Sequence, residues 1–146
     1  MPHHDTAFGI CFTYPDGWEL CEECADDQVS LTVSSPGTAF WSVTIMPDGP
    51  NPDDVIRAAV AAYEQEYDEL DVRETAGDSN AGRSPGAEVN FVCLDLTSTA
   101  ILTARRLGRL TLLILYQSDD ADLEHLQPVM EQINASLRLA SNRPPD

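Results

Sequence analysis

The sequence contains no lysine. All eight basic residues are arginine, against 25 aspartates and glutamates, so the formal net charge is −17. A field of this sign repels phosphate backbones, and we therefore expect no nucleic-acid partner. The same field would attract a basic partner or divalent cations. An acidic, lysine-free surface also fits simple adaptation to host salt conditions and codon bias.

Long apolar segments are also missing. The longest apolar runs cover only residues 58–63 and 112–116, far short of the roughly 20 residues that span a bilayer. The first ten residues combine neither a basic start nor an apolar stretch, so no secretory signal is expected. We therefore expect a soluble, cytoplasmic protein, monomeric or homodimeric, with no membrane insertion. In that compartment the four cysteines stay reduced rather than forming disulfides.

Motifs of conventional catalysis are absent from the sequence. It has no G-x-S-x-G elbow, no glycine-rich phosphate loop and no H-E-x-x-H. His125 is the one histidine away from the N-terminus, and we expect it to be an exposed helical residue beside Glu124. The sequence thus predicts neither an enzyme nor a bound cofactor.

Alternating apolar residues predict a β-rich chain. Residues 8–14 alternate and end in the turn YPDGW, and 29–33 and 41–45 read as a hairpin. Longer strands are predicted near 87–96, 98–107 and 109–117, whereas the acidic stretch 19–27 and the glycine-rich stretch 76–86 read as loops.

Two helices are predicted between and after these strands. The first covers about 52–69, with Asn51 as its cap and Pro52 at its first position. The second covers about 119–137 and contains Pro128, which predicts a kink or a break. The order of elements predicts one α+β domain over residues 1–146, with mobile ends at about 1–6 and 140–146.

Three groups of residues carry a resemblance to a known family. They are the opening strand and turn, a Y-x-S segment and a stretch of the last helix: Phe8, Ile10, Phe12, Tyr14, Pro15, Gly17 and Trp18; Tyr116 and Ser118; Pro128, Val129, Glu131, Ile133, Ser136 and Leu137. In these the chain resembles the PsbP-like superfamily, which includes the extrinsic photosystem II subunit, a Ran-binding nuclear transport factor and DcrB-like bacterial proteins. The resemblance implies an α-β-α sandwich around a mainly antiparallel sheet, in a family that mainly binds other proteins without catalysis.

The acidic stretch after the YPDGW turn is the candidate partner-binding surface. It combines carboxylates with two nearby indoles, which suits electrostatic recognition with aromatic anchors. The candidate residues are Trp18, Glu19, Glu22, Glu23, Asp26, Asp27 and Trp41. The resemblance implies that the partner is another protein, with the chain acting as an adaptor or chaperone in a bacterial complex or secretion system.

The CEEC motif inside that stretch offers an alternative, a small zinc protein. Zinc needs four ligands, and the CxxC at Cys21 and Cys24 has no second pair. Cys11 with His3 or His4 would have to complete the site. A redox role is disfavoured, because the flanking carboxylates oppose formation of a reactive thiolate.

Overall fold

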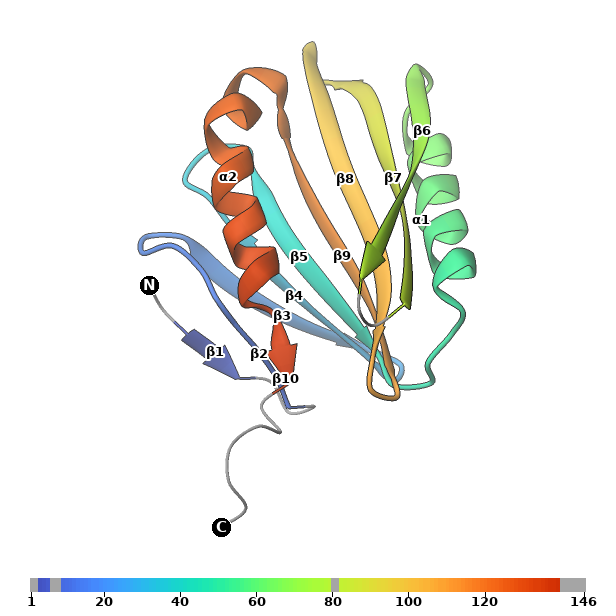
Figure 1. The fold of residues 1–146 in the computed structure, drawn as a ribbon. Helices are drawn as coiled ribbons and strands as arrows, with labels where there is room; N and C mark the ends of the chain where they lie inside the picture. Colours follow the sequence, from blue (N-terminus) through green and yellow to red (C-terminus); the bar gives the residue numbers. More distant parts are fainter. Residues whose placement is uncertain (1–2, 6–8, 80–81, 140–146) are drawn as a thin grey trace.

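The computed structural model describes residues 3–5, 9–79 and 82–139, with side chains for 9–75 and 84–138. Apart from residues 3–5, the ends predicted to be mobile lie outside the described residues. The described residues form an α+β fold with two helices and two sheets (Figure 1). The elements, in order, are β1 (His3–Asp5), β2 (Ile10–Thr13), β3 (Glu19–Ala25), β4 (Gln28–Ser34), β5 (Phe40–Met46), α1 (Pro52–Glu66), β6 (Leu70–Ser79), β7 (Gly82–Cys93), β8 (Leu96–Leu107), β9 (Leu110–Asp119), α2 (Asp120–Ser136) and β10 (Arg138–Leu139).

A seven-stranded antiparallel sheet forms the centre of the molecule. Its strand order is β3-β4-β5-β9-β8-β7-β6, so β3 and β6 are its edges. A smaller sheet, β1-β2-β10, lies beside α2, and Ser136 ties the two together by accepting the Thr13 amide hydrogen at 2.9 Å. The fold class predicted from the sequence is therefore confirmed.

The two helices cover different parts of the sheet on opposite faces. α2 and β2 pack on one face, over the apolar side chains of β4, β5 and β9. α1 packs on the other face, over the small and aliphatic residues of β7, β8 and β9. No helix among the described residues is long and apolar enough to cross a membrane.

The first helix begins as the sequence predicts. The Asn51 side chain accepts the Asp53 amide hydrogen at 2.9 Å, and Pro52 occupies the first turn. Val55 and Ile56 are its most buried residues. The helix ends at Glu66, three residues before the predicted end, because Tyr67 adopts an extended backbone.

The second helix begins one residue later than predicted and continues through its proline. Asp119 caps it by accepting the Asp122 amide hydrogen at 2.9 Å, and this bond holds the pKa of Asp119 below its usual range. The predicted break at Pro128 was wrong, since one helix covers Asp120–Ser136. Pro128 is exposed, so water can hydrate the carbonyl that its missing N–H leaves without an intrahelical donor.

Two stretches read as loops are strands in the structure. Residues 19–25 of the acidic stretch form β3, paired with β4 from Glu19↔Ser34 to Ala25↔Gln28. The glycine-rich stretch belongs to the β6–β7 hairpin, whose ladder continues to Ser79↔Gly82. Neither stretch shows the apolar alternation of a half-buried strand, because β3 is solvated on most of its length and the β6–β7 hairpin is rich in glycine and serine.

Candidate functional site

The acidic hairpin, β3–β4 with its turn Asp26–Asp27, holds most of the predicted binding residues. β3 is exposed along its length except at Leu20, which packs against the core beneath α2. Side chains alternate along a strand, so Glu22 and Cys24 share the face of Leu20, whereas Glu19, Cys21 and Glu23 occupy the opposite face. The predicted carboxylates therefore spread over both sides of one sheet edge instead of forming one surface.

This alternation also corrects the zinc prediction. Cys21 and Cys24 are three residues apart in a strand, so their thiols point to opposite faces and cannot hold one metal ion. Cys11 is buried in β2, and the side chains of His3 and His4 lie outside the described residues. Across residues 9–75 and 84–138, no three His, Cys, Asp or Glu side chains are grouped to bind a metal.

The two tryptophans belong to the core rather than to a surface. Trp41 is completely buried, packs in a tilted arrangement against Phe12 with ring centroids 5.0 Å apart, and donates its indole N–H to Asn134 Oδ1 at 2.6 Å. Its predicted role as an exposed anchor was therefore wrong. Trp18 is half-buried and packs against the same core, so most of its apolar area already has partners inside the chain.

The position of β3 gives its glutamates a structural role. An edge strand presents unpaired backbone groups that invite pairing with another chain, and charged side chains prevent this. β3 carries Glu19, Glu22 and Glu23 at that edge, and the turn adds Asp26 and Asp27. If two copies paired β3 against β3, carboxylates would face carboxylates, which is destabilising.

A second hairpin has the opposite chemistry at its end. Pairing with β6 stops at Phe91 of β7, and pairing with β9 stops at Ser98 of β8. Residues 92–97, which we call the apolar tip, therefore project beyond both neighbouring strands (Figure 1). Four large apolar side chains of the described residues are exposed, and three of them lie in this tip: Val92 (44%), Leu94 (90%) and Leu96 (48%).

The turn of the apolar tip is conformationally unfavourable. Leu94 and Asp95 connect the paired residues Cys93 and Leu96, and their φ angles are +52° and +65°. Two-residue turns of this type favour Asn-Gly or Asp-Gly, because both positions require positive φ. For an ordinary L-residue the left-handed region costs about 1–2 kcal/mol. Leu94 therefore suits neither the backbone geometry nor the solvent around it.

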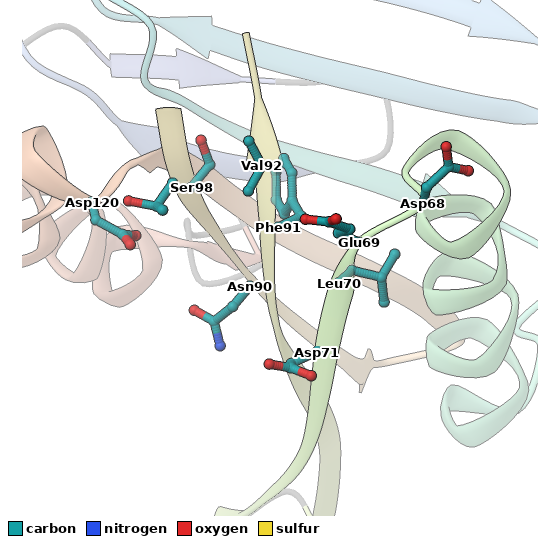
Figure 2. A pocket seen from close by; sticks show the side chains of 10 residues that line it. Asp68, Glu69, Leu70, Asp71, Asn90, Phe91, Val92, Ser98 and Asp120 are labelled. Carbon is teal, nitrogen blue, oxygen red and sulfur yellow. The ribbon is translucent and has the colours of Figure 1, made fainter. Parts of the chain in front are cut away.

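An acidic pocket of about 490 Å³ opens beside the tip. Figure 2 shows Asp68, Glu69 and Asp71 on one side of β7 and Asp120 on the other. Phe91 and Val92 lie between these two walls. All four charged residues that line the pocket are acidic and exposed, whereas Arg73, two residues further along β6, is paired with Glu88 at 2.8 Å. The pocket thus combines an apolar floor with carboxylate walls.

Hydrogen bonds hold part of the pocket in place. The Thr99 hydroxyl lies 2.6 Å from Asp120 Oδ1 and 2.9 Å from Asn90 Oδ1, which links the start of α2 to β7 and β8. On the α1 side, Tyr67 and Phe91 pack with ring centroids 4.4 Å apart behind the tip. The base of the tip is therefore held by hydrogen bonds on one face and by aromatic packing on the other.

The tip was not predicted from the sequence. The apolar pattern predicted strands at 87–96 and 98–107, which placed the turn near Thr97 instead of at Leu94–Asp95. The observable signal was Asp95, the one charged residue between Val92 and Leu96. A charge that interrupts an apolar run marks a turn more often than a strand interior.

Comparison with known proteins confirms the fold. No family model and no curated protein matches the sequence. Solved structures do match, and one is a cyanobacterial PsbP from Synechocystis, which is 14% identical over 94% of this chain and 91% of that chain, with a TM-score of 0.62. Another is the protein PA94 of unknown function from Pseudomonas aeruginosa, described as a putative regulator, which is 11% identical over 100% of this chain and 98% of that chain, with a TM-score of 0.56. A third is LpqN from Mycobacterium tuberculosis, involved in cell envelope biogenesis, which is 14% identical over 89% of this chain and 82% of that chain, with a TM-score of 0.51. The chain has a PsbP-like fold, as its sequence resemblance implied.

Proposed function

We propose that the chain is a non-catalytic accessory module that binds another protein, as an adaptor or chaperone in a bacterial complex or secretion system. The observation that carries this proposal is the concentration of exposed apolar side chains on the projecting tip at Val92, Leu94 and Leu96. Apolar residues gathered on one exposed element mark interaction sites in folded proteins. Leu94 is the proposed anchor.

The similar structures support a binding role without defining it. Their descriptions name a PsbP protein, a putative regulator and a protein involved in cell envelope biogenesis, and none of them names a reaction. Proteins with one fold have many different roles, so the function is inferred from the exposed apolar residues of the tip rather than from the fold. We place the module in the cytoplasm, in line with the expectation from the sequence.

The acidic hairpin has a secondary part in this proposal. Glu19, Glu22 and Glu23, with Asp26 and Asp27, are proposed to attract a basic partner over a distance, and the half-buried Trp18 is proposed to add a minor apolar contact. Exposed charges of this kind mainly raise the rate of association and contribute little to the final affinity. The anchoring role predicted for the two tryptophans thereby passes to Leu94.

Covalent cross-linking in the natural host tests the proposal. A tagged parent chain is compared with the double variant Leu94→Asn, Asp95→Gly, which keeps a favourable hairpin turn but removes the anchor. We expect a specific protein to cross-link to the parent chain and to be lost with the variant. Equal recovery with both chains, or no protein above background with the parent, would overturn the proposal.

A further inference from the structure

We infer that the partner docks through an apolar segment bearing arginine or lysine side chains, which packs on the apolar tip while its cations face the pocket beside it. This inference rests on the proposed function, and it adds the chemistry of the partner. It follows from the position of the tip next to the four carboxylates in Figure 2.

The apolar half of the surface consists of Val92, which lines the pocket, and Leu94 at the end of the hairpin. Phe91 is buried on the α1 face of the hairpin, where it packs against Tyr67, whereas Val92 on the other face is 44% exposed and Leu94 at the turn is 90% exposed. Val92 faces the pocket opposite Thr97, and Leu96 lies on the other face of the hairpin. A partner segment that covers Val92 and Leu94 therefore passes directly over the pocket.

The charges beside the tip favour a partner segment with positive charge. Asp68, Glu69 and Asp71 approach from the start of β6, and Asp120 approaches from the start of α2. An acidic segment placed here would meet like charges on both sides, which costs affinity and slows association. A basic segment would meet opposite charges from the same two walls, within a chain whose net charge is −17.

A protein segment fits this surface better than a free metal ion does. In the part of the chain with described side chains, no three potential ligands are grouped around one point, so the four carboxylates act as separate walls. A bound cation would also leave Val92 and Leu94 in water. An apolar chain with cationic side chains uses both halves of the surface at once.

Binding of synthetic peptides to the purified chain tests this chemistry. Three fluorescent peptides of equal length are compared by anisotropy: alternating leucine and arginine, alternating leucine and glutamine, and alternating serine and arginine. We expect the leucine–arginine peptide to bind most tightly, and its affinity to fall as salt is raised. Weaker binding of both other peptides shows that the apolar and the cationic components are each needed.

Variants locate the binding on the molecule. Leu94→Asn with Asp95→Gly should weaken the leucine–arginine peptide by about tenfold or more, as expected for a central anchor. Asp68→Asn with Asp71→Asn should weaken it by about threefold to fivefold. The control Glu64→Gln with Glu124→Gln removes the same charge from exposed helical positions and should leave binding unchanged.

The outcomes separate this inference from the proposed function. The inference is overturned if the leucine–glutamine peptide binds as tightly, if the control weakens binding as much as Asp68→Asn with Asp71→Asn, or if no peptide binds. Should the cross-linked partner still depend on Leu94 in that event, the proposed function stands without this partner chemistry. If cross-linking of the partner is also independent of Leu94, both the inference and the proposed function are overturned.

Discussion

The acidic hairpin and the apolar tip each place a two-residue turn in water, with different side chains at the first turn position. Both turn through two residues, Asp26–Asp27 and Leu94–Asp95, and the first residue of each turn has a similar φ, +54° and +52°. Aspartate tolerates this conformation and is well solvated, whereas leucine satisfies neither condition. Folding and solubility are sufficient reasons for aspartate at the acidic turn, whereas neither is a reason for leucine at the other turn.

The two hairpins also differ in their position in the sheet. β3 is an edge strand, where the chain risks unwanted pairing, and its exposed residues include three glutamates. The β7–β8 hairpin has neighbours on both sides, and only its last six residues project beyond them. Charged side chains therefore oppose strand pairing with another chain at β3, which lies at the edge of the sheet along its whole length. Apolar side chains are exposed at the β7–β8 hairpin, where only the last six residues extend past the neighbouring strands.

The largest effect is expected from removing the charges of the β3 edge. The triple variant Glu19→Thr, Glu22→Thr, Glu23→Thr keeps a good strand former at each position while it removes the electrostatic barrier. We expect self-association to rise steeply with protein concentration, relative to the parent chain. Sedimentation velocity over a concentration series measures this.

A charge-matched control separates edge pairing from a general loss of repulsion. Glu64→Gln, Glu66→Gln and Glu124→Gln remove three charges from exposed positions on the helices. This control should sediment as the parent chain does. Similar self-association in both variants would mean that total charge, rather than the edge, keeps the copies apart.

A smaller effect, in the opposite direction, is expected at the apolar tip. Leu94→Asn with Asp95→Gly should raise the free energy of unfolding by about 1–2 kcal/mol, because both turn positions then tolerate positive φ. Urea denaturation monitored by circular dichroism gives this difference. A gain in stability together with a loss of binding would show that the native turn is retained for a reason other than folding.

The variant Leu94→Ala tests whether side-chain size or backbone strain matters. Alanine keeps the unfavourable conformation but removes most of the apolar side chain. Since Leu94 is 90% exposed, this change should alter stability by less than about 0.5 kcal/mol. A large destabilisation would instead place the leucine in an intramolecular contact.

Local sequence patterns were sufficient to locate the helices and the central strands, although not the continuity of α2 or the turn between β7 and β8. Asn51 and Pro52 mark the start of α1 by their own backbone chemistry, independently of distant residues. β8 and β9 lie inside the sheet, so burial imposes a periodicity that is visible in the sequence. The PsbP-like fold was recognisable for the same reason, since its shared residues are mostly core and turn positions.

The edge strand and the tip were missed because their roles depend on distant neighbours. β3 is a strand through its pairing with β4, and its solvated side chains leave little apolar pattern. Leu94 reads as part of an apolar strand until the lengths of β6 and β9 show that it projects beyond them. Trp41 was misplaced for a different reason: its alternation with Val43 and Ile45 indicated the core, but its ring suggested an anchor.

The smallest effect is expected from the turn of the acidic hairpin. Asp26→Gly removes a side chain that already tolerates positive φ, and glycine adds conformational freedom to the unfolded chain. These two contributions oppose each other, so the free energy of unfolding should change by less than about 0.5 kcal/mol. Urea denaturation beside the Leu94→Asn, Asp95→Gly variant provides the comparison. Asp26→Gly could instead stabilise the chain as much as the tip variant does. Backbone strain would then be common to both turns, and the strain at Leu94 would no longer indicate a binding role.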